Sequence, residues 1–125
     1  MRCVKCPGKL HAKVVDDLVV DQCDRCEGIW FDSGELKRAL RGGLGRLRAQ
    51  TASAKASPPD HDSVRGNCPR CPGDGLLVRV VSRERQHLHV DTCSVCFGTW
   101  LDGGELDALK EPTLLQRLGD FLGKL

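Results

Sequence analysis

A motif that occurs twice limits how this chain can fold. It contains a Cys-x-x-Cys pair followed by glycine, tryptophan, aspartate and Gly-Glu-Leu, and its copies cover residues 23–36 and 93–106. A further Cys-x-x-Cys pair precedes each copy, so the eight cysteines of the chain form two sets of four. The first set is Cys3, Cys6, Cys23 and Cys26, and the second is Cys68, Cys71, Cys93 and Cys96.

Each set of cysteines has the composition of a structural zinc site. Four thiolates from two Cys-x-x-Cys turns are common ligands of tetrahedral Zn²⁺, and they leave no ligand position for water. The intervening residues, 7–22 and 72–92, are enough for a β-hairpin that brings the two turns together. We therefore predict two structural Zn²⁺ ions per chain. The spacing also allows an iron centre of rubredoxin type, whereas disulfides or a thioredoxin-like redox pair fit the pattern less well.

A repeat of this size is expected to need a metal, disulfides or a partner to be stable. The chain has 125 residues, of which 4% are aromatic, and the duplication predicts two small lobes. A lobe of roughly 35–45 residues buries too little apolar surface to offset the entropy of its chain. Metal binding is therefore expected to decide whether each lobe folds.

The pattern of apolar residues predicts the elements around these sites. Hairpin strands are expected at 9–15, 18–22, 76–82 and 87–92, short strands at 29–31 and 99–101, and helices from 34, at 104–110 and at about 113–124. Asp32 with Glu35, and Asp102 with Glu105, have the spacing of a capping box. Gly28 is expected to allow the turn of the second cysteine pair. Trp30 and Trp100 are expected to cover the sulfurs; a base-stacking role is the alternative.

These elements define the predicted fold, a small metal-dependent α+β protein with two tandem zinc ribbons. Each ribbon has a β-hairpin, two cysteine turns and a short helix. The predicted domains are ribbon 1 at 1–41, a flexible linker with a basic first half at 42–66, ribbon 2 at 67–110 and an amphipathic helix at 111–125. The leucine stripe of that helix is expected to pack on the core or on a second copy of the chain.

Charge gives a weaker indication of partners. The formal net charge is only +2, whereas a protein held on nucleic acid by charge alone is usually more basic. Two basic segments nevertheless offer phosphate contacts, and their members are Lys37, Arg38, Arg41, Arg46, Arg48, Arg83 and Arg85.

No segment has the ~18 apolar residues of a membrane span, and no signal peptide is visible, so we expect a cytoplasmic protein. The histidines at 11, 61, 87 and 89 are not needed as ligands.

The residues resemble a known family. The pattern Cys-x-x-Cys, hairpin, Cys-x-x-Cys-x-Gly-x-Trp-x-Asp-x-Gly-Glu-Leu is similar to the bacterial zinc-finger domain named after the zinc ribbon of transcription factor IIB. The resemblance covers about 3–40 and 68–110. It implies a zinc ribbon with the eight cysteines as ligands, and its name suggests a connection with transcription.

No nucleophile–base pair, phosphate loop or open metal position is visible, so we do not expect an enzyme. The favoured function is a zinc-binding interaction module that docks on a protein partner, with nucleic acid as a second possible ligand. The alternatives are a scaffold protein that self-associates through the C-terminal helix and a protein of zinc handling or thiol redox chemistry.

Overall fold

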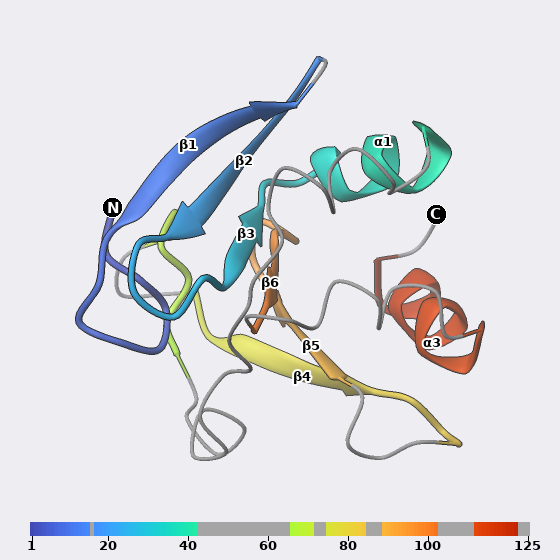
Figure 1. Ribbon diagram of the computed structural model, residues 1–125. Helices are drawn as coiled ribbons and strands as arrows, with labels where there is room; N and C mark the ends of the chain where they lie inside the picture. The colour runs from blue at the N-terminus through green and yellow to red at the C-terminus, as the bar shows by residue number, and fades with distance from the viewer. Residues whose placement is uncertain (16, 43–65, 72–74, 85–88, 103–111, 123–125) are drawn as a thin grey trace.

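The computed structural model describes residues 1–15, 17–42, 66–71, 75–84, 89–102 and 112–122, and these residues form one antiparallel sheet with two helices (Figure 1). The strands are β1 (Leu10–Val15), β2 (Leu18–Cys23), β3 (Ile29–Phe31), β4 (Leu77–Val81), β5 (His89–Cys93) and β6 (Thr99–Leu101). The helices are α1 (Glu35–Gly42) and α3 (Pro112–Leu122). None of the described helices is long and apolar enough to cross a membrane.

The two repeats share this sheet. The strand order is β1-β2-β3-β6-β5-β4, so the third strand of one repeat pairs with the third strand of the other. In this central pair Trp30 lies opposite Trp100, Ile29 opposite Leu101, and Phe31 opposite Thr99. The repeats are therefore joined by hydrogen-bonded strands as well as by the segment of chain between them.

The alternation of side chains along the strands gives the sheet two different faces. One face carries an apolar core in which Val20, Phe31 and Leu101 are buried together with Leu36 of α1 and Leu118 of α3. The opposite face carries Trp30 and Trp100, which are buried among the cysteines. The metal sites therefore lie on the side of the sheet that faces away from the helix-covered core.

The described elements agree closely with those expected from the sequence. All six predicted strands are present, with ends that differ by no more than two residues. The last helix begins at Pro112, where the fixed φ of proline suits the first turn of a helix. The predicted helix at 104–110 and most of the predicted linker at 42–66 lie outside the described residues.

The leucine stripe of α3 belongs to the core of this chain. Leu114 and Leu118 are fully buried, and Phe121 packs against the same cluster. The predicted domain boundaries remain a prediction, because the structure tests the pairing of the strands rather than the independence of the repeats.

Candidate metal centres

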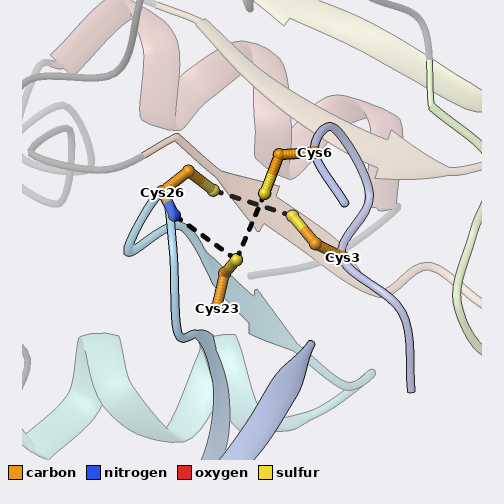
Figure 2. Close-up of side chains that lie close together, drawn as sticks. All are labelled: Cys3, Cys6, Cys23 and Cys26. Carbon is orange, nitrogen blue, oxygen red and sulfur yellow. Dashed lines mark hydrogen bonds between the residues drawn. The ribbon is translucent and has the colours of Figure 1, made fainter. Parts of the chain in front are cut away.

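The first set of cysteines converges at one end of the β1–β2 hairpin. Figure 2 shows the side chains of Cys3, Cys6, Cys23 and Cys26 pointing toward one another. The Cys3 and Cys26 sulfurs are 3.6 Å apart, and the Cys6 and Cys23 sulfurs are 3.4 Å apart. All four sulfurs lie within 4.8 Å of one another.

The second set forms an equivalent group at the corresponding end of the β4–β5 hairpin. The Cys68 and Cys96 sulfurs are 3.6 Å apart, and the four sulfurs of this set also lie within 4.8 Å of one another. A tetrahedral zinc ion about 2.3 Å from each sulfur separates the sulfurs by about 3.8 Å. Both groups therefore have nearly the size that zinc requires.

Backbone N–H groups of the cysteine turns point at the sulfurs. In the first site Lys5 N donates to Cys3 Sγ at 3.4 Å, and Gly8 N donates to Cys6 Sγ at 3.3 Å. In the second site Val95 N and Cys96 N both donate to Cys93 Sγ, at 3.3 and 3.4 Å. Such donors stabilise thiolates, which are the form that binds a metal.

Crowding makes the four thiols of each set unable to ionise together without a cation. The contact with Cys26 lowers the pKa of Cys3 to about 5, while the same contact raises the pKa of Cys26 far above its ordinary value. Burial raises the pKa of Cys6 to about 11 and also raises the pKa of Cys68. A divalent cation at the centre would remove this repulsion, so the donor set fits Zn²⁺.

The turn of each second cysteine pair uses an unexpected residue. Glu27 and Phe97, which directly follow the last cysteine of each site, have φ angles of 62° and 63°. The prediction that Gly28 supplies the turn is therefore wrong. Gly28 is needed for space, since a Cβ atom there would lie 2.2 Å from the Trp100 ring, and Gly98 has the same relation to Trp30.

The two tryptophans form the junction between the repeats. Trp30 and Trp100 are both fully buried, and each packs against the glycine of the other repeat. They also contact the cysteines of the two sites. Their predicted packing role is confirmed, and the alternative of a base-stacking platform is wrong because neither ring is accessible.

The aspartates after the tryptophans bind the indoles, and at Asp32 this differs from the role expected; the predicted cap of Asp102 with Glu105 lies outside the described residues. Asp32 Oδ1 accepts from Trp30 Nε1 at 2.8 Å, and Asp102 Oδ1 accepts from Trp100 Nε1 at 2.9 Å. The Glu35 N–H donates to the backbone oxygen of Asp32 rather than to its carboxylate. The predicted capping box is thus replaced at Asp32 by a bond that orients the indole.

Each of these aspartates also forms an ion pair with a basic side chain of the other repeat. Lys5 Nζ lies 2.9 Å from Asp102 Oδ1 and 2.9 Å from Asp91 Oδ2. At the equivalent position of the second repeat, Arg70 Nε lies 2.8 Å from Asp32 Oδ1, and Arg70 Nη2 lies 3.2 Å from Asp21 Oδ2. The second of the two residues between the first cysteines of each repeat therefore contacts the other repeat.

Sequence reasoning missed the buried polar group around Lys5. His89, Asp91 and Asp102 are buried with potential ligand atoms within 4.8 Å of one another. Burial alone would raise the pKa of Asp102, but His89 and Lys5 together lower it to about 2. Because the Lys5 ammonium contacts both carboxylates, it supplies the cation of this group. The internal duplication could have drawn attention to these carboxylates, since Asp91 and Asp102 of the second repeat correspond to Asp21 and Asp32 of the first.

The remaining predicted binding residues do not form one described group. Arg38 Nη2 contacts the Asp17 carboxylate at 3.0 Å, and Arg83 is exposed beyond the end of β4. His11 Nε2 lies 3.1 Å from Asp24 Oδ2, away from the sulfurs. The side chains of Lys37 and Arg41, and the whole of Arg46, Arg48 and Arg85, lie outside the described part of the chain.

Two groups of four cysteines on paired hairpins, each with inward-pointing N–H groups, define a tandem zinc-ribbon protein. The family described as transcription factor zinc-finger, of the type found in transcription factor IIB, matches residues 2–42 and again residues 67–112. The chain belongs to this family as two tandem copies, and it is a zinc-binding module with two structural zinc ions. No curated protein and no solved structure matches the chain.

Proposed function

We propose that the protein is a non-enzymatic docking module whose zinc ions stiffen a surface for a protein partner. The ligands of the first ion would be Cys3, Cys6, Cys23 and Cys26, and those of the second Cys68, Cys71, Cys93 and Cys96. In this proposal the metal serves the fold, since each set of four sulfurs would complete a tetrahedral site. The description of the family supports a partner connected with transcription.

The observation that carries this proposal is an exposed apolar pair at the far end of the β1–β2 hairpin. Val14 and Val19 lie opposite each other in the two strands, and they are 70% and 42% exposed. This end of the hairpin projects from the molecule (Figure 1). Exposed apolar side chains that adjoin one another, as these two do, form the kind of contiguous surface on which a protein partner can dock.

The hairpin end is held firmly from its other side. Val15 and Leu18, next to the exposed pair, are buried in the core with Leu36 of α1. Arg38 of α1 also donates to the Asp17 backbone oxygen at 2.9 Å. A partner would therefore meet a surface that is already ordered, which lowers the entropy lost on binding.

The repeats differ at this place, which supports a role for the first hairpin alone. The position of Val19 corresponds to His89 in the second repeat, and His89 is buried. Self-association through α3 is less favoured as a function, since Leu114 and Leu118 already pack into this chain's own core.

The proposal can be tested by affinity purification from the native cell with a Val14→Asp/Val19→Asp variant. The matched control is Leu76→Asp/Val78→Asp, which removes two exposed apolar side chains from the other edge of the sheet. We expect wild type and the control to recover the same partner and the hairpin variant to lose it, with equal zinc content in all three. Recovery of the same proteins by both variants would contradict the proposal.

A further inference from the structure

A basic hollow lies where β4 ends beside α3. It has a volume of about 500 Å³ and is lined by Arg79, Val81, Ser82, Arg83 and Arg117. Three of these five residues are arginines and none is acidic. The volume falls within the ~300–1,000 Å³ of ordinary ligand sites, so the hollow is large enough to hold a charged group of a ligand.

Hydrogen bonds fix the elements that carry these arginines. Ser82 Oγ and Thr113 Oγ1 are 2.7 Å apart, and the Arg83 backbone N–H donates to Thr113 Oγ1 at 3.2 Å. Arg117 lies one helical turn after Thr113 in α3, which stands beside the end of β4 (Figure 1). Thr113 therefore holds together the loop and the helix that contribute Arg83 and Arg117.

Within the part of the chain that the structure describes, the charge of the hollow is only partly balanced by the residues around it. Arg79 Nε lies 3.7 Å from Asp91 Oδ1, but the Asp91 carboxylate also contacts the Lys5 ammonium at 2.9 Å. Glu84 follows Arg83, and Asp120 follows Arg117 by three positions; both are exposed. Among the described residues, the Arg83 and Arg117 guanidinium groups thus leave an excess of positive charge in the hollow, beside Arg79, which is partnered by Asp91.

We propose that this hollow binds the phosphates of a nucleic-acid strand. The planar fork of arginine matches phosphate oxygens through paired hydrogen bonds. Every nucleotide of a strand carries one phosphate charge whatever its sequence, whereas an extended peptide carries an acidic side chain only where its sequence supplies one, and on one face at most about every 6.6 Å. Several guanidinium groups in one small hollow therefore suit a strand that is charged at every unit. Val81 also offers little of the apolar surface that anchors a protein partner.

This site is separate from the proposed protein-docking surface, which lies on the first hairpin. The two proposals can therefore fail independently. Both repeats are expected to need zinc to fold, so the test uses the full zinc-loaded chain.

The test is fluorescence anisotropy with a labelled single-stranded oligonucleotide of mixed sequence, titrated with the wild type and with Arg83→Gln/Arg117→Gln. The matched control, Arg2→Gln/Lys9→Gln, removes the same charge from two exposed residues of the first repeat. We expect the hollow variant to bind about tenfold more weakly and its plot of log K against log salt to be shallower by about 1.4, or 0.7 for each lost contact. The control should bind as the wild type does.

Three results would overturn the proposal. The first is that the wild type does not bind the oligonucleotide at low salt. The second is that the two double variants lose the same affinity. The third is that poly-glutamate of the same total charge binds more tightly than the oligonucleotide and that its binding depends on Arg83 and Arg117, which would assign the hollow to acidic peptides. Equal zinc content and equal melting temperatures of the variants exclude loss of folding as the cause.

Discussion

Lys5 and Asp102 are 97 positions apart in the chain, yet Lys5 Nζ lies 3.0 Å from Asp102 Oδ2 and 2.9 Å from Asp102 Oδ1. The Lys5 side chain is completely buried by this contact. Arg70 makes the equivalent contact with Asp32 from the other repeat, but its side chain remains 44% exposed. The two repeats therefore hold each other through a reciprocal pair of ionic contacts that differ in burial.

This difference predicts unequal effects of removing the two cations. Lys5→Ala removes the ammonium group that both buried carboxylates contact and leaves Asp91 with the more distant Arg79 guanidinium at 3.7 Å. Breaking a buried pair in this way costs roughly 3–5 kcal/mol. Arg70→Ala removes a half-exposed guanidinium whose contact with Asp32 water can replace, and exposed pairs contribute about 0–1 kcal/mol. Its contact with the buried Asp21 adds to this loss, which still stays below that of Lys5→Ala. Urea unfolding of both variants in excess zinc, followed by circular dichroism, measures the two losses.

Arg70→Ala serves as the matched control, since it lies at the same place between two cysteines as Lys5. Equal losses of unfolding free energy in the two variants would show that burial does not increase the contribution of the Lys5 ion pairs to stability. Native mass spectrometry must find two zinc ions in each variant before the comparison is made.

Gly28→Ala should loosen the junction between the repeats. Its new methyl group would meet the Trp100 ring, and overpacking of this kind costs roughly 1–3 kcal/mol. Trp100→Phe removes the ring atoms concerned, so the double variant should lose less stability than the sum of the two single losses. The control is Gly34→Ala, where φ is 89° and no atom lies within 4 Å of the added Cβ. The loss from Gly34→Ala should add to that from Trp100→Phe, and additivity at Gly28 as well would contradict the packing argument.

The local parts of this fold could be predicted from the sequence because their determinants are close together in the chain. Cysteine spacing identifies both metal sites, and the apolar runs on either side of Asp17 and Arg83 identify the hairpins. These features depend on turn geometry within about 20 residues. The structure accordingly matches the predicted strands within two residues at each end.

The junction between the repeats could not be predicted in the same way. Ile29–Phe31 and Thr99–Leu101 are each recognisable as a short strand, but a run of three residues does not specify which strand it pairs with. Asp32 is compatible with a helix cap and with an indole partner, and only the position of Trp30 decides between them. The partners of Lys5 lie in the other repeat, so no local pattern indicates them.

Loss of one metal site should affect both repeats because the sheet is continuous across them. Zinc binding contributes roughly 10–16 kcal/mol in small peptides, whereas a domain has a net stability of about 5–15 kcal/mol. We therefore expect chelation to unfold the chain. Cys23→Ser and Cys93→Ser should each bind one zinc ion by native mass spectrometry and melt in a single transition well below that of the wild type.

The outcome that would contradict this coupling is a two-step melting curve in which one step stays at the wild-type temperature. Such a curve would mean that the intact repeat folds without its neighbour. The pairing of β3 with β6 would then contribute little to stability.

Glu35 predicts a pH dependence that can be separated from that of the metal sites. Its Oε2 atom is buried without a hydrogen-bond partner among the described residues. Burial, together with the charges of Asp32 and Asp21, raises the pKa of Glu35 to about 7 from its ordinary value of 4.5. A raised pKa means that the folded state holds the proton more tightly. The resulting stabilisation is complete below pH 4.5 and is lost as the pH rises through about 7.

Glu35→Gln should therefore melt above the wild-type temperature already at about pH 6, and by a wider margin at about pH 8.5, because the wild type loses stability from pH 4.5 until its folded-state carboxylate has ionised above about pH 7. This range avoids the acid conditions that protonate thiolates and release zinc. Glu84→Gln removes the same charge from an exposed side chain and serves as the control. Differential scanning calorimetry at several pH values measures the effect. If Glu35→Gln differs from the wild type by the same amount at both ends of this range, ionisation of Glu35 is not what limits stability, and the neighbouring carboxylates must then be screened by Arg70 and Arg38.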